Sequence, residues 1–427
     1  MRSSFPLTRL ATIVAGVALA TPAAAGGLGL PERGARAVAR AGAIVAGADD
    51  AEALWQDPAG LAHLAGDGAK SFVFAAVYLF EAGDVGLGNR QPGTLLPTVA
   101  AALGVGDRLV IAGGITSPTF GVHRYDPASP TRYASIATTD SSFTLVTLGA
   151  AYAISDRLRV GATLQDLVSH VASSFALSLC TTRCPDASAE AIATLDVHDH
   201  VAPSGSLGVQ YDATPALALG LELQAPTRIA ASGTLAIQVP AAANLTGDRA
   251  RLAYALPPTV RAGAELRLAA LRLELALDVE LWSLQDGVAI VPEDIALAGA
   301  PLGALAIPRH DRASFAPSLG AEYRIGDASF AAGIAYETAA TPVGEVSALA
   351  IDAGKLVLGV GGGYASGGWR IGAAVGFAQL ADVTVAPAAA VVPVLQPLGD
   401  PPSATGANAG TYRSRSLLVG LRLGRVF

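Results

Sequence analysis

Strict alternation of side-chain character over residues 271–282 is the sequence feature that most constrains the fold. Every odd-numbered residue there is apolar, and four even-numbered ones are charged: Arg272, Glu274, Asp278 and Glu280. Successive side chains of a β-strand point to opposite faces, so a strand here has one aliphatic face and one ionic face. A helix would spread both kinds around its axis. Similar alternation recurs over 260–268, 315–325, 369–377 and 417–423, which predicts an all-β protein.

The connections between the predicted strands alternate in length. Short turns are expected at 106–108, 155–157, 212–215, 269–270, 326–327 and 366–368. Long polar or proline-rich connections are expected at about 82–96, 117–141, 179–199, 231–256, 285–312, 339–354 and 385–413. Six short turns and seven long loops join fourteen strands. An even number of antiparallel strands with this arrangement is typical of an outer-membrane β-barrel.

Composition favours a membrane barrel over the alternatives. The chain is 52% hydrophobic and 15% charged, whereas soluble domains have about 25% charged residues. A spanning helix needs roughly 20 apolar residues without breakers, but uncharged runs such as 229–247 contain glycine and proline. A soluble β-sandwich also alternates, yet it would carry a solvated charged face. We therefore predict a fourteen-stranded antiparallel transmembrane β-barrel.

The remaining composition limits the possible functions. A net charge of −7 argues against nucleic-acid binding, which requires a basic surface. No Gly-x-Ser-x-Gly turn is present, and Gly361-Gly362-Gly363 lies in an apolar strand pattern rather than in a phosphate-binding loop. We expect neither enzymatic activity nor a cofactor. His198-Asp199-His200 is a weak metal candidate; a solvated loop is the favoured interpretation, so no metal site is predicted.

The amino terminus resembles a secretory signal. Arg2 and Arg9 flank the start of an apolar run over 10–20, and small residues at 23–25 suit cleavage. Residues 1–25 are predicted to be a signal peptide; an uncleaved membrane anchor is the alternative. Because export leads to an oxidising compartment, Cys180 and Cys184 are predicted to form a local disulfide.

Residues 26–68 lack the two-residue period and carry alanines at helical spacing, so they form a small separate unit before a barrel over 69–427. This unit ends in Asp57-Pro58-Ala59-Gly60-Leu61, which resembles the Asn-Pro-Ala-Gly motif in the hatch of the FadL/TodX-type outer-membrane transport family, with Asp57 in place of the asparagine. Further resemblances follow in order along the chain: Gly27-Leu28-Gly29-Leu30, Ala48-Asp49-Asp50-Ala51, Gly114-Ile115-Thr116-Ser117-Pro118, Leu256-Pro257-Pro258 and Leu319-Gly320-Ala321-Glu322-Tyr323-Arg324.

The resemblance implies a monomeric channel for passive uptake of hydrophobic small molecules, namely long-chain fatty acids or hydrocarbons. It implies a lumen plugged by the hatch, termini in the periplasm, and a surround of outer-membrane lipid and lipopolysaccharide. Substrates would leave sideways where a kinked third strand, about 108–116 here, meets the hatch. Gly113 and Gly114 are the predicted opening, because glycine tolerates a bulge; the alternative is that these glycines only relieve crowding. Asp57 would need hydrogen-bond donors, and lumen arginines are candidates.

Several alternatives remain open. Inward charges either seat the hatch or line a solvated lumen; they are Arg272, Glu274, Glu265, Arg267, Glu322 and Arg324. The uncharged stretches 229–247 and 385–398 either collect apolar cargo at the barrel mouth, insert into lipopolysaccharide, or are low-complexity sequence without a role. A structural or adhesin-like barrel that transports nothing is the second functional hypothesis. An apolar path from the loops to the hatch would favour transport, and a lumen sealed by charge would favour the second hypothesis.

Overall fold

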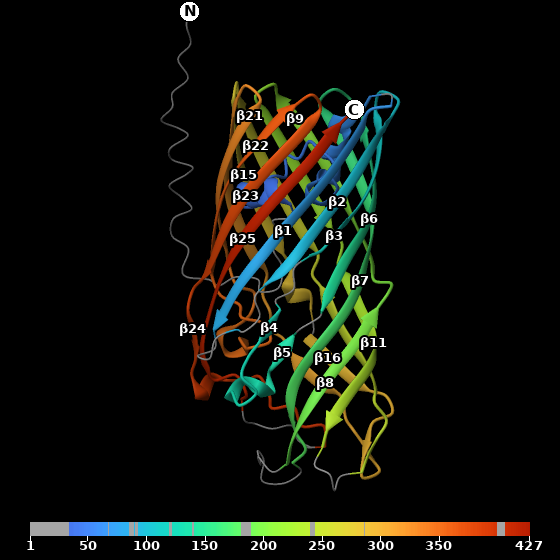
Figure 1. Cartoon of the computed structure of the whole chain (residues 1–427), viewed down its shortest axis with the longest axis vertical. Coiled ribbons are helices and arrows are strands. Elements are labelled where there is room, and N and C mark those ends of the chain that lie inside the picture. Colours follow the sequence, from blue (N-terminus) through green and yellow to red (C-terminus); the bar gives the residue numbers. More distant parts are fainter. Residues whose placement is uncertain are drawn as a thin grey trace, which may run out of the picture.

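The computed structural model describes residues 34–66, 68–84, 89, 93–118, 122–138, 141–180, 189–239, 244–285, 287–398 and 406–427. The predicted signal peptide, 1–25, lies outside these residues. Figure 1 shows a tall cylinder of tilted strands with the first helices inside it, close to the end that holds the carboxyl terminus.

Within the described residues, fourteen antiparallel strands form a closed ring, as predicted. Each pairs with the next, and the last pairs with the first. These wall strands are β1 (Lys70–Asp84), β2 (Thr94–Val105), β3 (Leu109–Thr116), β6 (Ser142–Ala153), β7 (Leu158–Ser178), β9 (Pro203–Thr214), β10 (Leu217–Gln224), β14 (Thr259–Leu268), β15 (Leu271–Glu280), β20 (Ser314–Ile325), β21 (Ala328–Glu337), β22 (Lys355–Ser366), β23 (Trp369–Leu380) and β25 (Gly410–Val426).

The six short turns lie where the sequence predicts them, all at one end of the cylinder, here called the turn end. Several need a positive φ, which the tight turns of two-residue hairpins require. Gly326 has φ 58° between β20 and β21, and Gly367 and Gly368 have φ 57° and 81° between β22 and β23. At Ala269 a non-glycine residue takes φ 49° between β14 and β15.

The opposite end, here called the loop end, has more strand than the sequence analysis predicts. Parts of the expected loops 179–199, 231–256 and 285–312 form β8 (Glu190–Asp199), β11 (Thr227–Gln238), β13 (Arg249–Leu256), β16 (Gly287–Pro292) and β19 (Leu305–Pro308). These strands pair in the order β7, β8, β11, β13, β16 and β19, so they raise one side of the wall, as Figure 1 shows.

Shorter elements complete the loop end. They are β4 (His123–Arg124), β5 (Ala137–Thr138), β12 (Leu245–Thr246), β17 (Ala296–Leu297), β18 (Ala300–Pro301), β24 (Val383–Val385) and the 3-10 turns η3 (Pro130–Tyr133), η5 (Trp282–Leu284), η6 (Val343–Glu345) and η7 (Pro387–Ala389).

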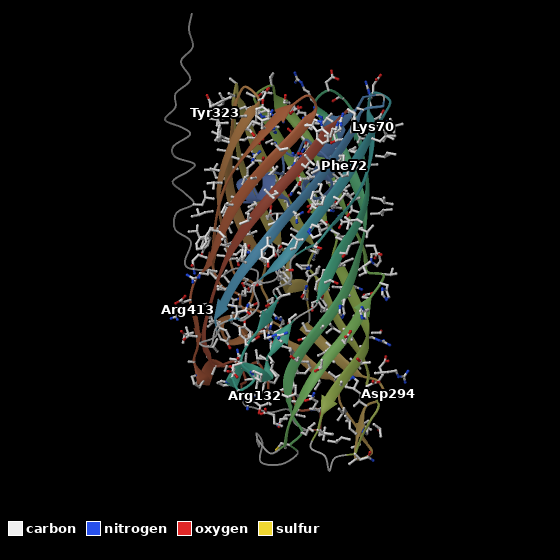
Figure 2. All side chains as sticks on the ribbon, viewed as in Figure 1. Lys70, Phe72, Arg132, Asp294, Tyr323 and Arg413 are labelled. Atoms are coloured by element: carbon white, nitrogen blue, oxygen red, sulfur yellow. The ribbon has the colours of Figure 1, made fainter. Side chains whose placement is uncertain are left out.

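The two faces of the wall differ as the alternation predicts. On β15, Leu275 is 62% exposed on the outer face, whereas Glu274 is fully buried on the inner face. Apolar side chains of many strands share the outer face, and Figure 2 shows side chains projecting from the wall along its height. No helix in the described part of the chain is long and apolar enough to cross a membrane.

The segment before β1 forms three short helical turns inside the ring: α2 (Ala35–Ala39), α3 (Ala53–Gln56) and η2 (Pro58–Leu64). We call residues 34–66 the hatch. Almost all of its apolar side chains are buried, including Val38, Leu54, Trp55 and Leu61. The helices are too short to be stable alone, so the hatch owes its conformation to the surrounding wall.

Candidate functional site

The predicted hatch motif forms a single capped turn. Asp57 precedes η2, and its Oδ1 accepts a hydrogen bond from the Ala59 amide at 3.0 Å. Pro58 occupies the first position of the turn, where its missing N–H costs nothing. Gly60 lies so close to the Ala48 carbonyl that a side chain would collide with it. The donor found for Asp57 is therefore a backbone amide, rather than the arginines suggested by the sequence analysis.

Asp57 is buried with its second carboxyl oxygen unpartnered among the described residues. Burial raises the pKa of this hatch carboxyl well above its usual range, and the carboxylates of Glu222 and Glu274 add to the effect. The raised pKa favours the protonated form of Asp57. A protonated carboxyl offers one acceptor and one donor, which is how the side-chain amide of an asparagine would serve.

Asp57→Asn is therefore expected to leave the fold intact and to flatten its dependence on pH. A group whose pKa is raised by folding costs stability as the pH rises from its unfolded pKa towards its folded one, by up to ~1.4 kcal/mol per pH unit. The asparagine removes this loss. Thermal unfolding in detergent at a series of pH values from about 4 upwards measures the difference. Asp57→Ala, as control, loses the cap at every pH, by ~1 kcal/mol; parallel curves for wild type and Asp57→Asn would contradict the prediction.

Glu274 of β15 is the main link between the wall and the hatch. Its carboxylate accepts hydrogen bonds from the amides of Val45, Ala46 and Gly47 at 2.6, 2.7 and 3.1 Å. It also accepts one from Nη2 of Arg40 at 2.9 Å. The side chains of Glu274 and Arg40 are both fully buried. Ion pairs that are shielded from water in this way interact strongly, and their loss leaves an uncompensated charge.

Further ion pairs between the wall and the hatch surround this link. Together they form a layer of ion pairs across the barrel. Arg272 donates to Asp49 of the hatch at 2.6 Å, and Arg36 of the hatch donates to Glu322 of β20 at 3.2 Å. Glu265 lies 3.5 Å from Arg40. On β25, Arg422 binds two hatch carboxylates, those of Asp50 and Glu52, at 2.7 Å each.

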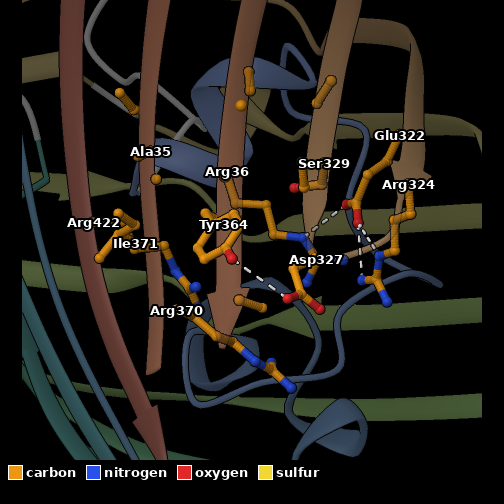
Figure 3. Close-up of a pocket in the computed structure, with 18 of the residues that line it drawn as sticks. Ala35, Arg36, Glu322, Arg324, Asp327, Ser329, Tyr364, Arg370, Ile371 and Arg422 are labelled. Carbon is orange, nitrogen blue, oxygen red and sulfur yellow. Dashed lines mark hydrogen bonds and ion pairs between the residues drawn. The ribbon is translucent and has the colours of Figure 1, made fainter. Parts of the chain in front are cut away.

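This layer answers the question that the sequence analysis left open for the inward charges. Four of them contact the hatch: Arg272, Glu274, Glu265 and Glu322. In the described residues, Arg267 and Arg324 pair with carboxylates of the wall. Figure 3 shows Arg36 reaching between the strands to Glu322, which Arg324 contacts from the other side.

A polar pocket of about 230 Å³ lies on the turn-end side of the layer. It is drawn in Figure 3 and combines Arg36 of the hatch with Asp327, Tyr364, Arg370 and Arg422 of the wall. Charged side chains on both sides keep it hydrated, so it does not suit an apolar molecule.

The inner wall also carries glycines wherever the hatch comes closest. A methyl group at any of these positions would lie within 3.0 Å of a hatch atom: Gly104, Gly114, Gly149, Gly161, Gly208, Gly220, Gly263, Gly320, Gly333, Gly359, Gly361 and Gly376. They come from eleven wall strands, β2 to β23, and we call them the glycine seat. Because they have no side chains, the wall meets the hatch with the density of a protein core.

The loop end differs chemically from the turn end. A cavity of about 130 Å³ lies there, lined chiefly by apolar side chains. Its walls include Phe143 of β6, Phe175 of β7, Leu195 of β8, Ile290 of β16 and, from a loop, Leu395. We call it the apolar cavity.

Buried apolar side chains connect the apolar cavity to the hatch. One contiguous cluster contains Phe143, Phe175 and Leu195 together with Leu54 and Trp55 of the hatch. An apolar molecule in the cavity thus borders a cluster of apolar side chains that extends to the hatch. Beside this cluster, Arg261 of β14 pairs with Glu222 and Asp278 and donates to the Trp55 carbonyl. The sequence analysis associates transport with an apolar path from the loops to the hatch, and this cluster supplies apolar side chains along such a path.

Gly113 and Gly114 lie in β3 as predicted, but the wall is closed there. Gly113 pairs with Ala101 of β2 and with Leu148 of β6, and the register is continuous on both sides. The structure thus has no bulge at these glycines. Gly114 faces inward against the Trp55 ring, while Gly113 lines an apolar groove on the outer face with Ala101 and Leu148. The lateral opening stays a prediction.

Cys180 is buried just after β7 and is not a free thiol. Cys184, its predicted partner, lies outside the described residues, so this pairing also stays a prediction. Sequence analysis missed the cavity residue on β8, Leu195, because it assigned 179–199 to a loop. The alternation of Ala191, Ala193, Leu195 and Val197 with polar residues was the signal that could have found it.

The fold and the site together define an outer-membrane barrel that is closed by an internal hatch and used for transport. Residues 16–391 match the outer membrane protein transport protein family (OMPP1/FadL/TodX), and the chain belongs to this family. The predicted family, membrane and absence of enzymatic activity are confirmed, because this is a family of outer-membrane transport channels.

Solved structures agree on the fold. A Pseudomonas aeruginosa FadL homologue superposes with a TM-score of 0.77 at 16% identity, over 94% of this chain and 99% of that one. The Ralstonia pickettii toluene transporter TbuX gives 0.69 at 17% identity, over 93% and 99%. The P. putida toluene transporter TodX gives 0.64 at 14% identity, over 93% and 99%. No curated protein matches the sequence significantly.

Proposed function

We propose that this protein takes up hydrophobic small molecules, long-chain fatty acids or hydrocarbons, passively across the outer membrane as a monomer. The loop end faces the medium, and both termini face the periplasm. The observation that carries the proposal is the apolar cavity at the loop end, which one cluster of apolar side chains joins to the hatch, with a polar pocket on the turn-end side of the hatch.

This arrangement suits apolar cargo. Burial of each CH₂ group contributes about 0.8 kcal/mol, so a hydrocarbon leaves water for the apolar cavity. To move straight on through the barrel, the hydrocarbon would have to pass the ion pairs around Glu274 and Arg40. It has no polar group that could replace the partners of these buried charges. The layer therefore favours another exit.

We propose that the exit is sideways through the wall at Gly113, with the hatch as its gate. Three features support this route. Trp55 and Leu54 of the hatch contact the inner wall at Gly114 and Gly149, and an apolar groove crosses the outer wall at Gly113. A shift of the hatch and local separation of β3 from a neighbour would connect the apolar cluster with lipid.

The alternative, a barrel that transports nothing, is favoured by the tightness of the glycine seat. The ion pairs that hold the hatch leave room at the loop end, however, for a cavity lined chiefly by apolar side chains. A function confined to surface display would not require a cavity lined by Phe143, Phe175 and Leu195.

Leu195→Glu tests the transport proposal. Leu195 points into the apolar cavity with 2% of its surface exposed, so a carboxylate there is expected to reduce uptake of a labelled long-chain fatty acid and of toluene by at least about tenfold. Thr194→Glu is the matched control, since Thr194 is the adjacent residue and lies exposed on the opposite face of β8. Assembly of both variants is checked by the heat-dependent shift of folded barrels on gels. Equal uptake by both variants would reject transport through this cavity.

A further inference from the structure

Three side chains on the outer face of the raised wall, His170 of β7 with Asp196 and His198 of β8, converge on one point. We propose that they form a binding site for a divalent transition-metal ion, in the first place Zn²⁺. The site is separate from the lumen, so it stands whether or not the transport proposal does.

The backbone places the three groups. His170 and His198 are direct cross-strand partners in the β7–β8 ladder, and Asp196 lies two residues before His198 on the same face. Partners in such a position have Cβ atoms about 5 Å apart. The ligand atoms of the three side chains all lie within 4.8 Å of one another. β8 is also paired with β11 through Asp196 and His198, so the site belongs to a sheet that is continuous on both sides.

The carboxylate already orients both imidazoles. Nε2 of His170 lies 3.1 Å from Oδ1 of Asp196, and Nε2 of His198 lies 3.3 Å from the same oxygen. The two rings stack with centroids 4.1 Å apart and an interplanar angle of 6°. Both ring nitrogens thus face one place, and a small movement of the carboxylate would admit an ion between the three groups.

The choice of metal follows from the donors. Two imidazoles and one carboxylate suit Zn²⁺, Ni²⁺ and Cu²⁺, whereas Ca²⁺ and Mg²⁺ prefer sites made of oxygen. Three protein ligands leave a further position for water or another ligand. The side chain of His198 is 47% exposed and that of Asp196 is 53% exposed, so an ion can enter from water.

The surroundings are those of a water-exposed surface. Ser142 of β6 faces His170 and Ser232 of β11 faces His198, and Thr194 is exposed beside them. Leu164, 76% exposed on the same face of β7, lies six residues nearer the turn end. The metal site therefore lies on the loop-end side of the apolar outer surface.

The sequence candidate His198-Asp199-His200 shares one residue, His198, with this cluster. Asp199 faces the lumen side, where its carboxylate accepts from the amides of Val201 and Ala230. Asp196 shares the face of His198 instead. The same alternation puts Val171 and Leu195, neighbours of the site, on the wall of the apolar cavity. A bound ion would join the two strands that line this cavity.

Titration calorimetry with ZnCl₂ tests the site on the full chain, purified in detergent without a polyhistidine tag and treated with a chelator. We expect one Zn²⁺ per chain and much weaker binding of Mg²⁺ or Ca²⁺. His170→Ala, Asp196→Asn and His198→Ala are each expected to weaken Zn²⁺ binding by at least about tenfold. His310→Ala is the matched control, because His310 is an exposed histidine that pairs with a single carboxylate, Glu345.

Two results would overturn the proposal: no Zn²⁺ binding by the wild type, or binding by the three variants that equals that of His310→Ala. The gel shift of folded barrels shows that each variant is assembled. Should His170→Ala fail to assemble, His170→Gln keeps the volume and removes the imidazole, and the same loss is expected. Anomalous scattering at the zinc edge from soaked crystals locates the ion, and a peak away from His170 and His198 would equally reject the site.

Discussion

Glu274→Ala is expected to loosen the hatch and make the barrel leak. The substitution removes the acceptor of three hatch amides and of Arg40. Arg40 is then left buried, with only the more distant carboxylates of Glu265 and Glu322 at 3.5 and 3.9 Å. Removing one partner of a buried ion pair costs about 3–5 kcal/mol. This loss is comparable to the whole folding free energy that a segment as small as the hatch can contribute. Single-channel recording in planar bilayers should show higher ion conductance, and cells should become more sensitive to bulky polar antibiotics.

Glu280→Ala is the matched control for this experiment. Glu280 lies on the same strand and also faces inward, but in the described residues its carboxylate accepts from Trp282 and Ser314, not from the hatch. Conductance of this variant should remain at the level of the wild type. If the ion conductance of Glu274→Ala equals that of Glu280→Ala, Glu274 does not hold the hatch.

Disulfide locks across β3 are expected to stop uptake if cargo leaves through the wall. The pairs Ala101→Cys with Gly113→Cys, and Gly113→Cys with Leu148→Cys, join residues that are direct partners and point outward. One lock fixes β3 to β2, and the other fixes β3 to β6. Because a separation of strands must break the ladder on one side, oxidation of at least one pair should lower uptake of a labelled fatty acid by about tenfold or more, and a reducing agent should restore it.

A lock on the opposite wall separates this effect from general stiffening. Ala321→Cys with Ala332→Cys joins β20 to β21 at an equivalent outward position. Oxidation of this pair should leave uptake unchanged. Full uptake with the β3–β2 lock closed and, in the separate variant, with the β3–β6 lock closed would refute lateral exit at β3 and leave the apolar cavity as a binding site with another outlet.

The barrel wall could be predicted from the sequence because its strands and turns depend on residues that are close together in the chain. A two-residue period fixes which side chains face lipid, as in β15, and a turn such as Gly367-Gly368 needs only residues that tolerate a positive φ. The raised strands were missed for a physical reason. In β8 and β11 the outer face is polar, since it lies beyond the apolar outer surface, and polar segments were read as loops.

The site was harder to predict because its contacts are distant along the chain. Arg40 and Glu274 are 234 residues apart, and Arg422 and Asp50 are 372 apart. Resemblance placed Asp57-Pro58-Ala59-Gly60 in the hatch, and alternation placed Glu274 in the lumen. Neither could say that Glu274 binds the backbone at Val45, because this depends on how the hatch turns inside the closed ring.

The glycine seat has a consequence for how this chain can change over generations. At the positions of the glycine seat the wall backbone lies directly against hatch atoms, so a single added carbon at Gly161 or Gly333 meets main-chain atoms that have no room to retreat. A substitution at one of these wall glycines must therefore be accompanied by a compensating substitution in the hatch. We expect these glycines and the facing hatch positions to vary together among relatives, so that plugs exchanged between distant members of the family would fail to fit.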